Sequence, residues 1–227
     1  MDSKETPFSR LIPRLILASQ SSGRLQLLEE MGCQVVVKPT YIDETRPLKE
    51  TPEIVAILAK RKLEGYFEQH SPPLIPLLAA DTLIDFKGEI VGKAKTAAEA
   101  KIILEKFSNK SHTVYSAYAL YLPHLGTTLE GVEATKVTFK PLSEKEIDNY
   151  LFGGEWQGAA GAYRIQGEAA PFIDSIEGEI STVVGLPIEA ISAILKQLSF
   201  WTQNIRRMVR NSEGDGLNRP SQEELCP

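Results

Sequence analysis

The sequence is poor in the residue types on which many metal centres and disulfide frameworks depend. It has 2 cysteines and 3 histidines among 227 residues. Cys33 and Cys226 have neither the spacing of a zinc site nor the number that a disulfide framework needs. The histidines are scattered, and no H-E-x-x-H motif occurs. These absences argue against a zinc protein and against a disulfide-stabilised extracellular domain.

Long apolar runs and basic tracts are also missing. No uninterrupted apolar stretch reaches membrane-spanning length, and the N-terminal segment MDSKETPFSRLIPR lacks the apolar core of a signal peptide. The net charge is −5, from 25 Lys and Arg against 30 Asp and Glu, which is not the basic footprint of a nucleic-acid-binding protein. We therefore expect a soluble cytoplasmic protein that binds neither membranes nor nucleic acid. An anionic ligand would have to be held by a few local cations.

What the sequence does contain is 42% hydrophobic residues in a regular succession of strand and helix signals. A first strand begins near residue 15, and further strands are predicted at 34–39, 77–86, 89–93, 112–122 and 129–142. Helices are predicted at 23–31, 51–69, 97–107, 144–152 and 188–201. The order of the elements indicates the α/β class, and the two long neighbouring strands favour a mixed sheet over a purely parallel one.

The segment LILASQSSGRLQLLEEMG (15–32) places serines and one arginine where a strand gives way to a helix. The first N–H groups of a helix are unpaired and carry partial positive charge. A loop of small residues there lets an anion approach the backbone, and Arg24 adds a fixed charge. The alternative is that Ser21 or Ser22 only caps the helix. Taken by itself, the segment favours the cap.

Carboxylates stand in two places that suit a binding site. Asp81 follows the apolar run LIPLLAA, and strand ends in α/β proteins are where ligands bind. The alternative for Asp81 is a hydrogen bond to a neighbouring turn. Asp43 and Glu44 are adjacent in the loop YIDET, and Mg²⁺ often needs only one or two carboxylates besides substrate phosphates. A solvated acidic loop is the alternative there.

Two lysines and an amide complete the set of candidate polar groups. Residues 92–94 do not form a Walker A loop, because alanine follows the lysine, but Lys93 can still act as a point charge for phosphate. Lys62 is either a second phosphate ligand or a solvated helix lysine. Gln166 lies in a glycine-rich stretch and can both donate and accept at a nucleobase edge, or pair with loop backbone. With the carboxylates, these groups suit a metal-bound phosphorylated small molecule.

Several of these segments occur together in one known family. LASQSSGRLQLLEEMG, YIDET, LAKRK, AADT, EIVGK, KVTFKPLSEKEI, GAYRIQG and IEGEISTVVGLP stand in the order and spacing of the Maf family. The sequence therefore resembles these nucleoside triphosphate pyrophosphatases over about residues 14–200, and 201–227 is expected to be a flexible polar tail. The resemblance implies a mixed α/β fold similar to that of inosine triphosphatases, with a cleft between two lobes, and it implies a homodimer.

The resemblance also implies metal-dependent hydrolysis of a nucleoside triphosphate to the monophosphate and pyrophosphate. Matched by motif, Asp81 is the catalytic residue that activates water, and Glu44 and Asp81 hold a divalent cation, Mg²⁺ or Mn²⁺. The phosphate-binding residues that the resemblance implies are Ser19, Arg24, Lys62 and Lys93. At the serine-rich segment, the resemblance thus favours an anion site over a simple helix cap.

Two matches and three departures bear on the nucleobase and on turnover. Thr82 and Gln166 match the branch that resembles dTTP/UTP pyrophosphatases, so dTTP and UTP are the implied substrates, with modified pyrimidine nucleotides left open. The family's first loop usually reads S-P-R-R, whereas Gly23 stands here where an arginine linked to substrate choice is usual. The family often carries Asp-Lys where this chain has Gly158-Ala159, and the family's asparagine in S-N-V-V-G-L-P is Thr182 here. These departures leave a second hypothesis open, a nucleotide-binding regulatory protein of septum-inhibitor type with little or no turnover.

Overall fold

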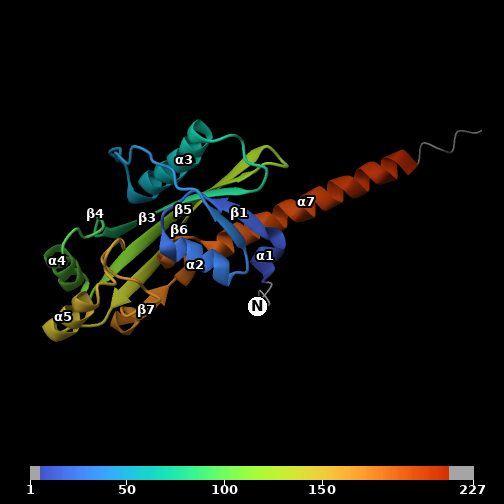
Figure 1. Cartoon of the computed structure of the whole chain (residues 1–227). Helices are drawn as coiled ribbons and strands as arrows, with labels where there is room; N and C mark the ends of the chain where they lie inside the picture. Colours follow the sequence, from blue (N-terminus) through green and yellow to red (C-terminus); the bar gives the residue numbers. More distant parts are fainter. Residues whose placement is uncertain (1–5, 215–227) are drawn as a thin grey trace, which may run out of the picture.

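The computed structural model describes residues 6–214, and its centre is one seven-stranded sheet (Figure 1). The strands are β1 (Arg14–Leu17), β2 (Gln34–Val37), β3 (Leu77–Phe86), β4 (Glu89–Val91), β5 (Ser111–Leu122), β6 (Thr127–Phe139) and β7 (Ile173–Glu177). Their order is β2-β1-β3-β5-β6-β7, with β4 paired to β3. β1 runs parallel to β2 and β3, and the other pairs are antiparallel. The expected α/β class with a mixed sheet is confirmed.

Seven α-helices surround the sheet in the described part of the chain. They are α1 (Pro7–Leu11), α2 (Ser22–Glu30), α3 (Thr51–Gln69), α4 (Ala97–Phe107), α5 (Glu144–Gly153), α6 (Ile180–Val184) and α7 (Ile188–Gly214). The helices predicted over 51–69 and 97–107 are confirmed as α3 and α4. The sequence does not predict α1 or α6, because five residues are too few to show a helical period. None of the described helices is long and apolar enough to cross a membrane.

The last helix is longer than the sequence predicts. The predicted helix ends near residue 201, whereas α7 continues to Gly214 and projects away from the sheet (Figure 1). No glycine or proline occurs between Ile188 and Glu213, so no strong helix breaker stops it earlier. The end of the predicted tail, 215–227, lies outside the described residues, and the flexibility of the tail stays a prediction.

The two strands predicted at 77–86 and 89–93 form a hairpin, β3 and β4, which is tied to α3. Lys87 and Gly88 have φ values of 57° and 84°, the left-handed pair that a two-residue type I′ turn requires. Asp85 accepts hydrogen bonds from Gly88 N through Oδ1 (2.8 Å) and from Thr51 Oγ1 through Oδ2 (2.7 Å). One carboxylate therefore fixes both the turn and the first residue of α3.

Alternate residues of β3 belong to hydrophobic cores on opposite faces of the sheet. Leu77 and Ala79 pack in a core that includes residues of α3. Leu78 and Ala80 pack in a second core that includes residues of α1, α2 and α7. This alternation is the ordinary two-residue period of a strand. The next residues of β3 are thereby directed to opposite faces as well.

The pairing of β1 with β3 is short, and this leaves part of one edge of β3 open. β1 pairs with β3 only at Ile16–Leu77 and Leu17–Leu78, whereas β4 pairs with β3 from Ile84 onward. Within the described part of the chain, residues 79–83 therefore have a strand partner on the β5 side alone. This stretch lies just beyond the carboxyl end of parallel β1, the position where open α/β sheets bind ligands.

Candidate functional site

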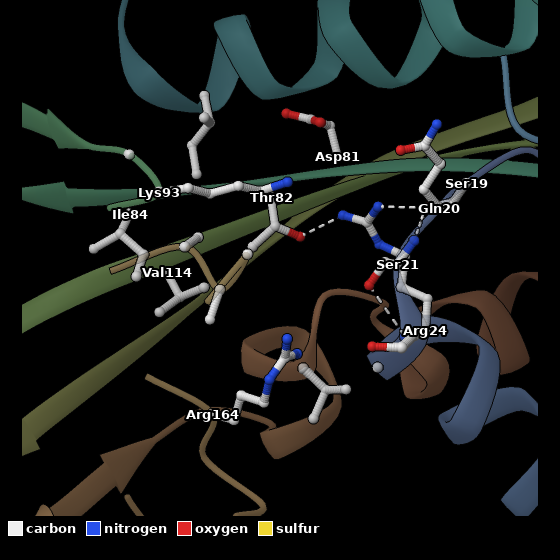
Figure 2. Close-up of a pocket in the computed structure, with 18 of the residues that line it drawn as sticks. Ser19, Gln20, Ser21, Arg24, Asp81, Thr82, Ile84, Lys93, Val114 and Arg164 are labelled. Carbon is white, nitrogen blue, oxygen red and sulfur yellow. Dashed lines mark hydrogen bonds between the residues drawn. The ribbon is translucent and has the colours of Figure 1, made fainter. Parts of the chain in front are cut away.

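A cavity of about 1260 Å³ lies along the open stretch of β3 (Figure 2). Its walls come from the loop after β1 and the start of α2, the loop at 40–46, β3, β4, and the glycine-rich segment 155–167. The structure brings all eight residues selected from the sequence to this cavity: Ser19, Arg24, Glu44, Lys62, Asp81, Thr82, Lys93 and Gln166. N-terminal and C-terminal parts of the chain face each other across it, which fits the expected cleft.

Arg24 is held by three acceptors from three different segments. Its Nη1 donates to Ser19 Oγ (3.0 Å), its Nη2 to Thr82 Oγ1 (2.8 Å) and its Nε to the carbonyl of Gly185 (2.8 Å). Only 7% of the residue is exposed. Burial lowers the pKa of Arg24, and the negative charges of Asp81 and Glu44 oppose that shift. A guanidinium has five N–H donors, so two remain for a ligand.

The sequence leaves open whether the serines beside Arg24 cap the helix or help form an anion site, and in the structure Ser19 and Ser21 have different roles. Ser21 is the N-cap of α2, and its Oγ accepts from Arg24 N (3.3 Å). Ser19, two residues earlier in the loop after β1, accepts both from the side chain of Arg24 and from Ser21 N (3.2 Å). The cap is therefore present at Ser21, while Ser19 serves to hold the cation at the cavity wall.

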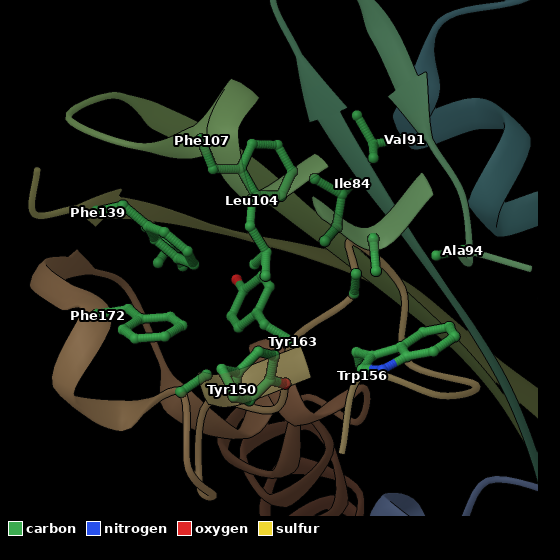
Figure 3. Packing of buried hydrophobic residues seen from close by; sticks show 14 of the residues in the cluster. Ile84, Val91, Ala94, Leu104, Phe107, Phe139, Tyr150, Trp156, Tyr163 and Phe172 are labelled. Atoms are coloured by element: carbon green, nitrogen blue, oxygen red, sulfur yellow. The ribbon is translucent and has the colours of Figure 1, made fainter. Parts of the chain in front are cut away.

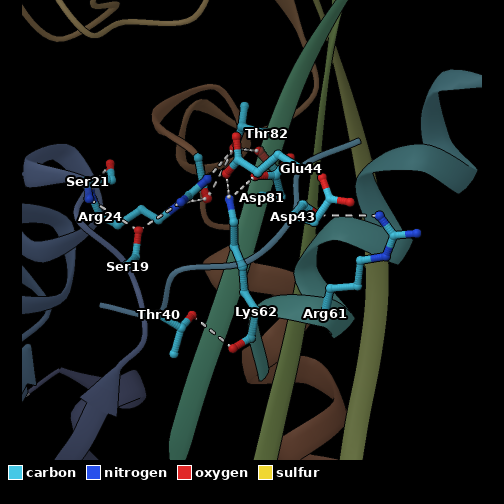
Figure 4. A network of polar contacts seen from close by, with 12 residues as sticks. Ser19, Ser21, Arg24, Thr40, Asp43, Glu44, Arg61, Lys62, Asp81 and Thr82 are labelled. Atoms are coloured by element: carbon cyan, nitrogen blue, oxygen red, sulfur yellow. Dashed lines mark hydrogen bonds and ion pairs between the residues drawn. The ribbon is translucent and has the colours of Figure 1, made fainter. Parts of the chain in front are cut away.

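A three-residue ion network faces Arg24 across β3 (Figure 4). The Nζ of Lys62, on α3, contacts Asp81 Oδ1 and lies 3.1 Å from Glu44 Oε1. The side chains of Lys62 and Asp81 are 14% and 11% exposed, so water screens this ion pair little. Partial burial raises the pKa of Glu44, but the positive charges of Lys62, Lys93 and Arg46 outweigh it, and the pKa lies below its usual value.

The loop that carries Glu44 is fixed by its neighbour Asp43. Asp43 Oδ1 accepts from Thr45 N (2.9 Å) and from Thr45 Oγ1 (2.5 Å). Arg61 donates to the carbonyls of Asp43 (3.4 Å) and Thr45 (2.8 Å). The two adjacent carboxylates of the loop therefore differ in role, because Asp43 shapes the loop and only Glu44 lines the cavity.

The opposite wall is formed by the glycine-rich segment 155–167. It joins the end of β4 through a bridge between Lys93 and Ala160 and a hydrogen bond from Gly161 N to the carbonyl of Gly92 (3.1 Å). Gln166 is exposed on this wall. Arg164, which the sequence does not select, also lines the cavity and donates to the carbonyls of Glu155 (3.2 Å) and Gln157 (3.0 Å).

One end of the cavity is apolar, with Ile84, Val114 and Tyr163 in its lining. Tyr163 belongs to the aromatic cluster of Figure 3, and its hydroxyl lies 2.8 Å from Nε2 of the buried His112. The imidazole stacks on Phe107 at a centroid distance of 4.0 Å. Burial lowers the pKa of His112 to about 4, so the ring is neutral near pH 7. Burial also raises the pKa of Tyr163. This end therefore presents an uncharged surface that suits a flat ring.

The carboxylates fit a divalent cation that is shared with a substrate. Asp81 and Glu44 both contact the same Lys62 nitrogen, so their oxygens converge on one region. The described residues contain no group of three or more His, Cys, Asp or Glu side chains that could hold an ion by themselves. Mg²⁺ bound through two carboxylates usually completes its shell with water and substrate phosphates. The donor set thus fits a cation that arrives with a phosphorylated ligand.

Comparison with known proteins agrees with this geometry. The family model described as "Maf-like protein" matches residues 14–198. The dTTP/UTP pyrophosphatase of Pyrococcus abyssi is 38% identical over 182 residues, covering 80% of this chain and 95% of that protein. The dTTP/UTP pyrophosphatase of Halalkalibacterium halodurans is 41% identical over 190 residues, covering 83% of this chain and 98% of that protein.

Among solved structures, the nucleoside-triphosphatase / dITP/XTP pyrophosphatase of Mycobacterium abscessus matches at a TM-score of 0.39 and 15% identity. The match covers 83% of this chain and 97% of that one. The assignment rests on the sequence comparisons, in which the family model spans most of the chain and the two relatives match over nearly their whole length. The chain therefore belongs to the family of Maf-like proteins.

Proposed function

We propose that this protein hydrolyses nucleoside triphosphates, with dTTP and UTP as preferred substrates, to the monophosphate and pyrophosphate. The observation that carries this proposal is the composition of one cavity. The cations Arg24, Lys62 and Lys93 and the carboxylates Asp81 and Glu44 are among the residues that line it, together with an apolar region. Cations suit a triphosphate, and an apolar region suits a base. The names of the two relatives support this substrate class.

In this proposal the triphosphate binds at the polar end of the cavity. Arg24 has two N–H groups left after its contacts with Ser19, Thr82 and Gly185, and these would donate to phosphate oxygens. Ser19 would contribute mainly by holding Arg24. Thr82 would contribute in the same indirect way, because its hydroxyl already accepts from Arg24.

The remaining substrate-binding residues lie along both walls. Lys62 and Lys93 would add point charges to the phosphate clamp. The nucleoside would extend toward the apolar end. There the side-chain amide of Gln166, on the rim of the cavity, would reach a base edge, because an amide can both donate and accept. Modified pyrimidine nucleotides are included as substrates, since Gly23 leaves the start of α2 without a second arginine.

Asp81 would act as the general base. It would accept a proton from a water molecule that attacks the α-phosphorus, the bond from that phosphorus to the bridging oxygen would break, and pyrophosphate would leave. Lys62 would keep the Asp81 carboxylate oriented, since the two side chains are in contact. A bound Mg²⁺ or Mn²⁺ on Asp81 and Glu44 would supply positive charge against the phosphate oxygens.

The alternative function is a regulatory nucleotide-binding protein without turnover. Asp81 favours the enzyme, because a protein that only binds the nucleotide has little need of a carboxylate that can accept a proton from water. A panel of nucleoside triphosphates with Mg²⁺ or Mn²⁺, assayed for monophosphate and pyrophosphate, tests this choice. Release of pyrophosphate from UTP and dTTP supports the proposal. Tight binding without any product at high protein concentration supports the regulator, and release of orthophosphate refutes the assignment of the cleaved bond.

Three further expectations accompany the proposed function. We expect a cytoplasmic protein, in keeping with a role in nucleotide metabolism. We expect no binding to nucleic acid, since the net charge is −5. The homodimer implied by the family resemblance stays a prediction, and light scattering of the purified chain would measure its mass in solution.

A further inference from the structure

Behind Arg24, a chain of three hydroxyl and carbonyl groups runs into the interior of the sheet. Arg24 Nη2 donates to Thr82 Oγ1 at 2.8 Å, and Thr82 Oγ1 lies 2.8 Å from Ser116 Oγ. Ser116 Oγ lies 2.7 Å from the carbonyl oxygen of Thr182. Ser116 is on β5, directly opposite Thr82 in the sheet, and is fully buried. It does not line the cavity.

The direction of every hydrogen bond in this chain follows from proton counting. A carbonyl oxygen can only accept, so the one hydroxyl proton of Ser116 goes to Thr182. Ser116 must then accept from Thr82, which uses the one hydroxyl proton of Thr82. The lone pairs of Thr82 are therefore left to accept from Arg24. The order of donation is Arg24 to Thr82, Thr82 to Ser116, and Ser116 to the Thr182 carbonyl.

Without Ser116, the Thr82 hydroxyl could donate its proton to a different acceptor, the carbonyl of Gly185. The carbonyl of Gly185 lies 3.4 Å from Thr82 Oγ1 and already accepts from Arg24 Nε at 2.8 Å. The backbone at Gly185 is packed so closely that a Cβ there would stand 3.0 Å from Thr82 Oγ1 and 3.2 Å from Arg24 Nε. A rotated Thr82 hydroxyl would thus compete with Arg24 for the same carbonyl.

We propose that Ser116 is a positioning residue for Arg24: by accepting from Thr82 it orients the Thr82 hydroxyl, and this turns the two free N–H groups of Arg24 into the phosphate end of the cavity. The inference rests on the proposed function for the identity of the ligand. Ser116 itself touches no substrate. Its removal should therefore weaken phosphate binding only through Thr82 and Arg24.

The substitution Ser116→Ala tests this cleanly because it leaves no carbonyl unpaired. The Thr182 carbonyl also accepts from Gly185 N at 3.1 Å. Ser111→Ala is the matched control, since Ser111 lies on the same strand and its hydroxyl is 2.9 Å from Thr138 Oγ1, outside the cavity. Thr82→Val removes the middle hydroxyl at constant shape, and Thr82→Ser retains it.

The measurement is the dissociation constant of inorganic tripolyphosphate with Mg²⁺, by titration calorimetry, together with kcat and KM for UTP. Ser116→Ala is expected to weaken tripolyphosphate binding about three- to tenfold, the usual effect of one lost hydrogen bond, and to raise KM more than it lowers kcat. In a Thr82→Val background, Ser116→Ala should have no further effect. Thr82→Ser, which keeps the hydroxyl, should weaken tripolyphosphate binding less than Thr82→Val does.

Equal binding in Ser116→Ala and Ser111→Ala would overturn the inference, as would a full additional loss in the Thr82→Val background. Should Ser116→Ala not fold, Ser116→Cys replaces the hydroxyl by a weak hydrogen-bonding thiol of similar shape and should shift binding in the same direction. Tripolyphosphate binding does not depend on turnover. A wild type that hydrolyses no nucleotide would therefore refute the proposed function while the titration still decides the role of Ser116.

Discussion

Asp81 and Thr82 are consecutive residues of β3, yet they contact opposite walls of the cleft. Asp81 binds Lys62 from α3, and Thr82 accepts from Arg24 of α2. Successive strand side chains point to opposite faces, and here the open edge of β3 lets both faces reach one cavity. The same two residues of backbone thus position the proposed general base and anchor the proposed phosphate-binding arginine.

Replacing Asp81 by asparagine should separate catalysis from binding. Asp81→Asn keeps the shape of the side chain but removes its ability to accept the proton of water. Positioned proton transfer is typically worth about 10²–10⁴ in rate, so kcat for UTP should fall by that order. Binding of a non-hydrolysable triphosphate analogue should persist or tighten, because one negative charge near the phosphates is lost.

Steady-state kinetics and a direct titration of the analogue measure both effects on the same preparation. Asp148→Asn, on the exposed side of α5, is the control and should leave both constants unchanged. If Asp81→Asn abolished binding but spared the rate at saturation, Asp81 would be a structural residue and not the base.

Replacing Arg24 should weaken binding. Arg24→Ala removes a buried cation whose two remaining N–H groups face the phosphates in this account. A charge-assisted hydrogen bond contributes about 1.5–3 kcal/mol, so tripolyphosphate should bind roughly ten- to hundredfold more weakly. Arg14→Ala, at an exposed position on β1, serves as the control. Unchanged affinity in Arg24→Ala, measured by calorimetry, would remove the phosphate site from the start of α2.

Restoring arginine at Gly23 should tighten nucleotide binding. A Cβ at Gly23 would meet its nearest neighbour, Val184 Cγ1, at 3.6 Å, which is ordinary contact, so α2 can accept a side chain there. Gly23→Arg should lower KM for its preferred nucleotide by about tenfold through one added charge-assisted contact. Gly23→Ala is the matched control, because both variants should stabilise the helix by about 0.5–1 kcal/mol but only arginine adds a charge. Identical nucleotide constants in the two variants would show that position 23 does not reach the substrate.

His112 should make the protein less stable in acid. Burial lowers its pKa in the folded state to about 4, below the ordinary histidine value of about 6.5. Between these values the unfolded chain binds a proton that the folded chain does not, so stability is full above about pH 6.5 and is lost as the pH falls toward 4. The loss from this residue should be roughly 3 kcal/mol, taking about 1.4 kcal/mol per pKa unit.

Urea unfolding at several pH values between 4 and 7 measures the slope of the free energy of unfolding against pH. His112→Phe should flatten the slope, since a phenyl ring can stack on Phe107 without titrating. His124→Gln, at an exposed position, is the control and should leave the slope as it is. An unchanged slope in His112→Phe would assign the acid sensitivity to other groups.

Local signals in the sequence predict much of the fold. The proline at the start of α3, the turn at Lys87-Gly88 and the cap at Thr96 each act on neighbouring residues, and the corresponding elements are confirmed. The capping box at Ser143 is likewise complete, with Glu146 bonding back to its backbone. The length of α7 is not predicted, because the polar segment after residue 201 contains no glycine or proline before Gly214 that would indicate where the helix ends.

The candidate site also contains residues that the sequence predicts and residues that it does not. Residues that carry charge within recognisable motifs, such as Asp81 and Lys62, can be selected from the sequence, and the structure brings them together. Ser116 and Gly185 could not be selected, because their importance arises from the pairing of β5 with β3 and from the path of the chain after α6. Arg164 was open to selection, since it lies two residues before Gln166 in the segment GAYRIQG.

The most direct test of the proposed reaction is hydrolysis of UTP in ¹⁸O-labelled water, with the products analysed by mass spectrometry. Attack on the α-phosphorus should place one ¹⁸O atom in UMP and none in pyrophosphate. Labelling should be lost with the activity in Asp81→Asn. Label in pyrophosphate, or release of labelled orthophosphate, would contradict attack at the α-phosphorus, and no labelled product at all would contradict an enzymatic role for this cleft.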